Sequence, residues 1–199
     1  LATLAAAQRL HRRQLTRAAV VRHRLCGSGA MAHLEHGGIA QLELEGVIGF
    51  SGTMKNSLLL HPNDSHIIYP LGATVVIRNV HDNKDQFFLQ GHTDRVTCIA
   101  MSKDGKQLAS GQITHMGYLA QILLWDISEL GTGQPTLVHT LRLHKVQIQA
   151  LAFSCEGTYL ASIGGPDDNN MVIWRTSDGM AVCGSPAAHD SALTVTWYN

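Results

Sequence analysis

The stretch "GHTDRVTCIAMSKDGKQLAS", residues 91–110, decides the fold because the chain repeats its pattern as "LHKVQIQALAFSCEGTYLAS" at residues 143–162. Both copies end in Leu-Ala-Ser, and in each a histidine precedes the final serine by eighteen positions. Each copy has the pattern of an alternating strand, a turn that contains glycine, and a second strand. An internal repeat of this kind indicates a modular architecture built from strands.

A tryptophan ends a further apolar run in both copies. "QILLWDI", residues 121–127, contains Trp125-Asp126, whereas "NMVIWRT", residues 170–176, keeps Trp174 and has arginine in place of the aspartate. The first copy is seven residues longer than the second, and the extra residues fall in two loops. Strand scaffolds tolerate insertions in their turns. We therefore expect four strands in each unit.

Gly91-His92 early in the first unit and Trp125-Asp126 late in it resemble the WD-repeat family, whose members are β-propellers. The resemblance implies a buried chain of hydrogen bonds from aspartate to histidine to serine to tryptophan, which fixes the packing of each blade when every member is satisfied. Leu119 occupies the aspartate position of the first unit, so we expect His92 to bond another partner or water. The predicted network residues are His92, Ser110, Trp125, Asp126, His144, Ser162, Asp168 and Trp174.

A weaker copy of the unit precedes the other two. Residues 58–80 keep the turn and the strands but lack the polar network. His61 stands at the position of Ser102, and Tyr69 stands at the position of Ser110. A fourth unit begins at His189 and stops at Asn199. We therefore predict an all-β, incomplete WD-repeat β-propeller of about three blades plus the first strand of a fourth.

The predicted partial propeller comprises residues 41–199. Its blades are expected at residues 47–90, 91–142 and 143–188, with the start of the next at 189–199. Propellers close with at least four blades, and three blades leave open sheet edges. We therefore expect the chain to be the N-terminal piece of a longer protein that is not a stable monomer alone.

Residues 1–40 are expected to lie outside the fold, as a disordered or helical extension. Residues 1–30 contain six arginines and no acidic residue, a composition that fits an unfolded upstream extension, a targeting segment or a frayed helix. From Met31 onward nine Lys/Arg face fifteen Asp/Glu, a net charge of 9 − 15 = −6. This mildly acidic body has no basic face of the kind that nucleic acid requires, so we predict no nucleic-acid partner.

Composition argues against several classes of site. The 199 residues are 45% hydrophobic, and no apolar run approaches the length of a membrane span. The four cysteines form no C-x-x-C pair, the twelve histidines are scattered, and "GPDDNN", residues 165–170, lacks the spacing of a calcium loop. We therefore predict a non-catalytic protein with no metal, cofactor, membrane partner or small-molecule substrate.

Longer stretches resemble one group of WD-repeat proteins, the microtubule inner proteins of motile cilia. These stretches lie within residues 41–199 and are "LELEGVIGFSG", "HPNDSHIIYPLGATVVIRN", "FLQGHTDRVTCIAMSKDGKQLASGQ", "IGGPDD" and "CGSPAA". The resemblance implies a structural protein in the lumen of axonemal doublet microtubules, where it stabilises them for ciliary and flagellar beating. Its implied partners are tubulin and other microtubule inner proteins, and its implied location is the cytoskeleton of the cilium or flagellum.

The loop "QITHMGYLA", residues 112–120, is the candidate partner-contact loop, with His115, Met116 and Tyr118 as its candidate contact residues. Methionine and aromatic residues favour protein interfaces, although Met116 and Tyr118 could also pack back on their own blade.

Two rival functions remain open. A soluble adaptor, such as a ubiquitin-ligase substrate receptor or a signalling scaffold, would carry a docking helix, and residues 1–46 contain no such apolar helix. A propeller enzyme would need polar or metal-binding side chains that converge at the channel mouth, and the sequence pattern provides none.

Overall fold

The computed structural model describes residues 18–22, 43–48, 52, 54, 57–82, 84–130, 133–187 and 192–198. The strands in these ranges form one two-stranded sheet and three four-stranded sheets. The chain divides into two compact units, residues 1–50 and 51–199. In the ranges described, no helix is long and apolar enough to cross a membrane.

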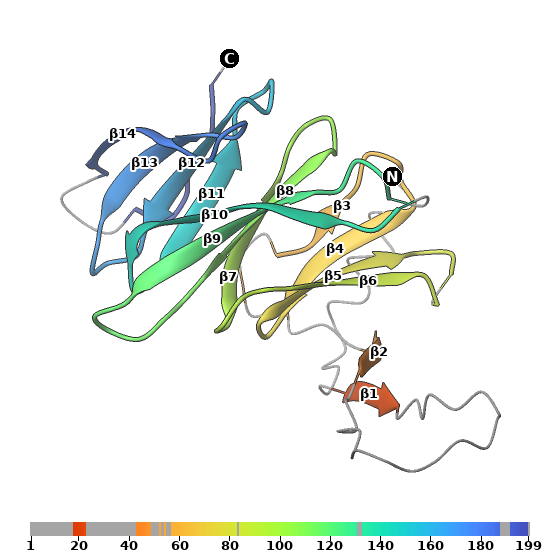
Figure 1. Cartoon of the computed structure of the whole chain (residues 1–199). Coiled ribbons are helices and arrows are strands. Elements are labelled where there is room, and N and C mark those ends of the chain that lie inside the picture. Colours follow the sequence, from red (N-terminus) through yellow and green to blue (C-terminus); the bar gives the residue numbers. More distant parts are fainter. Residues whose placement is uncertain are drawn as a thin grey trace, which may run out of the picture. The chain divides into compact units, whose positions relative to one another are not determined.

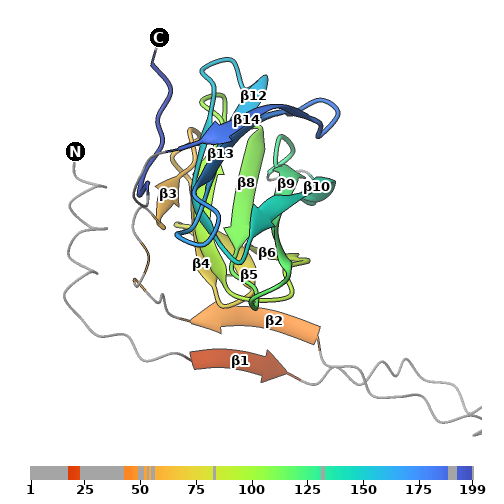
Figure 2. The same cartoon turned by 90° about the vertical axis from the view of Figure 1, so that its left-hand side faces the viewer.

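The first unit contains a pair of antiparallel strands, β1 (Ala18–Arg22) and β2 (Glu43–Ile48). Figure 2 shows the two arrows running in opposite directions. The expectation that residues 1–40 are disordered or helical is therefore wrong for β1. The β-branched pair Val20-Val21 favours a strand, and pairing with β2 satisfies backbone groups that a single strand would leave open. The rest of that predicted extension lies outside the described residues.

The second unit contains three antiparallel sheets whose strands follow chain order (Figure 1). The first sheet comprises β3 (Leu59–Leu60), β4 (His66–Leu71), β5 (Thr74–Asn79) and β6 (Gln86–Gln90). The second comprises β7 (Val96–Met101), β8 (Gln107–Gln112), β9 (Leu119–Asp126) and β10 (Thr136–Lys145). The third comprises β11 (Ile148–Phe153), β12 (Tyr159–Gly164), β13 (Asn170–Arg175) and β14 (Ala181–Pro186). Each sheet is one blade of a propeller.

The core lies between the blades, and strand β9 is buried on both of its faces. Ile122 and Leu124 pack into the apolar cluster shared with the third blade. Leu123 and Trp125, which alternate with them, pack into the cluster shared with the first blade. Successive side chains of a strand point to opposite faces, so a strand between two neighbouring sheets is apolar at nearly every position. This is the physical reason for the continuous run "QILLWDI".

Hydrogen bonds also join adjacent blades. The Thr97 hydroxyl on β7 donates to the Ile148 carbonyl on β11 at 2.6 Å. In the outer turns, the His61 Nε2–H donates to the Gly105 carbonyl at 2.9 Å. A Cβ at Gly105 would lie 2.8 Å from that histidine nitrogen, so the two turns approach closely only because this residue is glycine. The blades are therefore joined by polar contacts as well as by apolar packing.

The predicted first strand of a fourth blade is not present as a strand. Residues 192–198 have no regular structure, and His189 lies outside the described residues. A strand requires backbone pairing with a neighbour, and none of the described strands pairs with this segment. The segment instead makes a side-chain contact, because Trp197 Nε1–H donates to the Ala152 carbonyl on β11 at 2.9 Å.

Candidate interaction site

The third blade contains a buried chain of hydrogen bonds that starts at Trp174. Its Nε1–H donates to Ser162 Oγ at 2.7 Å, and the same oxygen lies 2.7 Å from His144 Nε2. His144 Nδ1 lies 2.5 Å from Asp168 Oδ2. Because a carboxylate only accepts, His144 Nδ1 carries the proton of this hydrogen bond. The structure therefore brings together the four residues that the sequence pattern grouped here.

The second blade contains the same chain with a different last member. Trp125 Nε1–H donates to Ser110 Oγ at 2.9 Å, and that oxygen lies 2.7 Å from His92 Nε2. His92 Nδ1 lies 2.9 Å from the amide oxygen of Gln112, a residue that our sequence interpretation did not assign to the network. Gln112 in turn donates to the Thr93 hydroxyl at 3.0 Å. A neutral amide thus replaces the carboxylate of the third blade.

The two acceptors reach the histidine from different positions. Gln112 pairs with the first residue of β7, and Gly164 pairs with the first residue of β11, so the two occupy equivalent places in their blades. A Cβ at Gly164 would lie 2.8 Å from the Cβ of Asp168, which leaves no room for both side chains. The acceptor therefore comes either from the strand, as Gln112, or from the following turn, as Asp168. Aligning Gln112 with Gly164 is the sequence signal that could have identified it.

One predicted network residue lies elsewhere. Asp126 is exposed, and its Oδ1 accepts the backbone N–H of Ser128 at 2.9 Å, so it caps a turn and does not contact the histidine. Leu119, at the position where the family pattern has aspartate, is also exposed. The Trp-Asp pair thus contributes its tryptophan to the network and its aspartate to the outer turn.

Burial sets the protonation state of two groups in the second blade. Burial lowers the pKa of His92, and its hydrogen bond with Gln112 partly opposes that shift. Burial also raises the pKa of the Cys98 thiol to about 12. Both groups therefore remain uncharged near neutral pH, as structural groups in a core do.

The candidate partner-contact loop, residues 112–120, is exposed at residues 115–119. Met116 is 79% exposed, Tyr118 is 67% exposed, and His115 is exposed as well. Since these side chains do not fold back onto their own blade, they are available to another molecule. Their role in partner contact stays a prediction.

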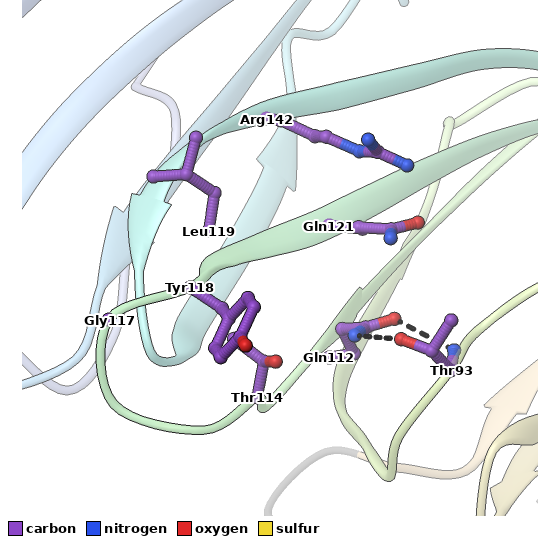
Figure 3. Close-up of a pocket in the computed structure, with 8 residues that line it drawn as sticks. All are labelled: Thr93, Gln112, Thr114, Gly117, Tyr118, Leu119, Gln121 and Arg142. Atoms are coloured by element: carbon purple, nitrogen blue, oxygen red, sulfur yellow. Dashed lines mark hydrogen bonds between the residues drawn. The ribbon is translucent and has the colours of Figure 1, made fainter.

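A hollow of about 400 Å³ lies beside this loop. Figure 3 shows its lining side chains, which come from β8, β9, β10 and the loops next to them. The residues that line it are Thr93, Gln112, Thr114, Gly117, Tyr118, Leu119, Gln121 and Arg142. Arg142 and Gln121 are register partners across β10 and β9, so the hollow brings an exposed cation and two amides to one end of the second blade. Our sequence interpretation assigned no role to Arg142 or Gln121, because only the strand register places them together.

Two segments of the chain match a known repeat family, described as "WD domain, G-beta repeat", at residues 83–126 and 135–175. Each match includes the outer strand of one sheet, β6 or β10, and ends with the third strand of the next sheet, β9 or β13. A family repeat therefore crosses from one blade to its neighbour. This arrangement ties adjacent blades together through the covalent chain.

Several relatives with similar sequences carry the same name. Cilia- and flagella-associated protein 52 of Chlamydomonas reinhardtii is 48% identical over 158 residues, which cover 79% of this chain and 25% of that protein. The Mus musculus protein of the same name is 49% identical over 150 residues, which cover 75% of this chain and 23% of that protein. The chain thus spans about a quarter of the length of the curated relatives it matches.

A solved structure supports the fold. "Structure of U3-55K" matches with a TM-score of 0.57 and 24% identity, covering 70% of this chain and 41% of that chain. Likeness at this level of identity concerns the fold alone. The chain therefore carries WD40 repeats that fold as three blades of a β-propeller, and about three quarters of its length is similar in sequence to cilia- and flagella-associated protein 52.

Proposed function

We propose that this chain is part of a non-catalytic WD-repeat protein of the ciliary and flagellar axoneme. The observation that carries the proposal is the 48% identity over 158 residues to a relative named as cilia- and flagella-associated.

The finer proposal is that the protein binds in the lumen of doublet microtubules, contacts tubulin and other microtubule inner proteins, and stabilises the doublet during beating. Two features support a binding role. The polar networks are buried within their blades, where they hold the scaffold rigid. The long loop of the second blade presents exposed Met116 and Tyr118 on that scaffold. Many small contacts repeated along a lattice give a high effective concentration, so each contact can be weak.

Extraction of axonemes tests the location. A tagged chain expressed in ciliated cells should remain with doublets through high-salt washing, because the tubule wall encloses it, and should be released only when the wall is opened. Release by mild salt, with the wall intact, would contradict a luminal position and would favour the soluble adaptor. An outer-surface axonemal protein that is released by salt serves as the control.

Alanine substitutions test the loop. Met116→Ala with Tyr118→Ala should reduce incorporation into doublets, because it removes the exposed apolar surface of residues 112–120. Met180→Ala with Tyr159→Ala is the matched control, since these residues are 63% and 38% exposed and lie in the third blade. Equal incorporation of the two double variants would remove the loop from the interface.

A further inference from the structure

The residues that line the hollow beside residues 112–120 include no Asp or Glu. Residues 105–125 and 130–155 contain no Asp or Glu, although the chain from Met31 onward is acidic overall. These two segments supply most of the lining, including Arg142. Thr93 is the remaining lining residue. Asp94 follows it in the sequence, and its Oδ1 accepts the backbone N–H of Arg95. The lining of the hollow therefore carries one cation, Arg142, and no anion.

Arg142 has no partner in the part of the chain that the structure describes. Its guanidinium is exposed and makes neither a hydrogen bond nor an ion pair there. Arg175, on the third blade, differs because its Nη1 donates to Asp178 Oδ2 at 2.8 Å. Figure 3 shows the side chains of Arg142, Gln121 and Gln112 extending in the same direction from three adjacent strands. An unpaired guanidinium beside an amide matches the planar, two-oxygen geometry of a carboxylate.

Exposed apolar side chains share the hollow with this cation. Tyr118 and Leu119 line it and are 67% and 48% exposed. Because Leu119 pairs with Lys145 across β9 and β10, a second cation lies at the same end of the blade. A bound segment could therefore place a carboxylate on the guanidinium and an apolar side chain on this surface.

We propose that the hollow binds an acidic peptide segment of a partner protein, with a Glu or Asp carboxylate against Arg142 and a neighbouring apolar side chain on Tyr118 and Leu119. This proposal rests on the proposed function, since it names the chemistry of the partner that the exposed loop contacts. The carboxylate supplies the anionic partner that Arg142 lacks. The amide of Gln121 donates to the second oxygen of that carboxylate.

Titration of the isotope-labelled chain with a short peptide of glutamate, leucine and glycine tests this chemistry by NMR. The Nε–H signal of Arg142 should shift on binding, and the same peptide with glutamine in place of glutamate should bind about tenfold more weakly. Arg142→Gln should weaken binding of the glutamate peptide by a similar factor. Gln121→Glu should do the same while keeping the arginine, because the new carboxylate pairs with the guanidinium.

Arg175→Gln is the matched control, since it removes an exposed arginine from another blade and should leave peptide binding unchanged. Equal binding of the glutamate and glutamine peptides, or wild-type binding by Arg142→Gln, would overturn the proposal. Tighter binding of a single-stranded DNA probe at the same residues would also overturn it. The assay contains no microtubules, so loss of doublet retention with intact peptide binding would reject the ciliary location and leave this site standing.

Discussion

Replacing Ser162 with alanine should destabilise the third blade more than any other change that removes a single oxygen atom from it. The Ser162 Oγ accepts from Trp174 Nε1–H and is hydrogen-bonded to His144 Nε2, each at 2.7 Å. Ser162 is 0% exposed, Trp174 is 4% exposed and His144 is 1% exposed. Alanine therefore leaves two buried nitrogen atoms, Trp174 Nε1 and His144 Nε2, without this partner, and water does not reach either of them.

The magnitude follows from counting the two orphaned groups. A buried polar group that loses its partner costs about 1–3 kcal/mol, so two of them cost about 2–6 kcal/mol. The missing oxygen atom itself leaves little empty volume, so we add no cavity contribution. This sum is a large share of the roughly 5–15 kcal/mol that stabilises an ordinary domain. Trp174→Phe keeps Ser162, His144 and Asp168 joined but also opens a cavity in the core, so it does not isolate the hydrogen bond as Ser162→Ala does.

Urea unfolding followed by tryptophan fluorescence measures this difference as a shift of the midpoint at constant slope. Ser128→Ala is the matched control, because Ser128 is exposed and should change the free energy of unfolding by less than about 0.5 kcal/mol. If Ser162→Ala and Ser128→Ala unfold at the same urea concentration, the hydrogen-bonded chain does not contribute to stability, and its structural role must be abandoned.

Burial lowers the pKa of His92 in the folded chain, so the unfolded chain binds more protons, and the free energy of unfolding should fall as the pH drops below about 6.5. Gln112→Glu should reduce this fall in a urea–pH series, because a carboxylate raises that pKa, and equal pH dependence of both proteins would contradict the assignment. Gly105→Ala should lower the melting temperature more than Gly117→Ala. Both glycines have positive φ angles, of 75° and 89°, but of the two only Gly105 would place a Cβ against other side chains, those of His61 and Pro62. If both variants lower the melting temperature equally, the close approach of the two turns at Gly105 does not affect stability.

The fold could be predicted from the sequence because its signals are local and occur twice. The equal eighteen-residue separation of His92 from Ser110 and of His144 from Ser162 reflects one strand–turn–strand unit, and both pairs form hydrogen bonds. Strand pairing in the N-terminal region was not predictable in this way. Its two strands are far apart in the sequence, and an Arg- and Ala-rich composition gives no alternation that would reveal β1.

The candidate site could be predicted only in part. The loop of residues 112–120 stood out as an insertion between two strands, and its exposed Met116 and Tyr118 follow from that position. Arg142 did not stand out, because its neighbours in the hollow come from two other strands and depend on the register of β9 and β10. A shift of register by one residue would turn Arg142 to the opposite face, and the sequence pattern does not determine the register to that precision.

The different acceptors in the two networks explain why the second blade has the longer loop. In the third blade Asp168 must return to His144 from the turn after β12, so the length and path of that turn are constrained, and Trp174 follows Ser162 by only 12 positions. In the second blade Gln112, on the strand itself, satisfies His92, and Trp125 follows Ser110 by 15 positions. The turn after β8 therefore has no network residue to deliver and can extend outward. The second blade thus departs from the family pattern at Leu119, keeps its network through Gln112, and leaves Met116 and Tyr118 of the loop exposed.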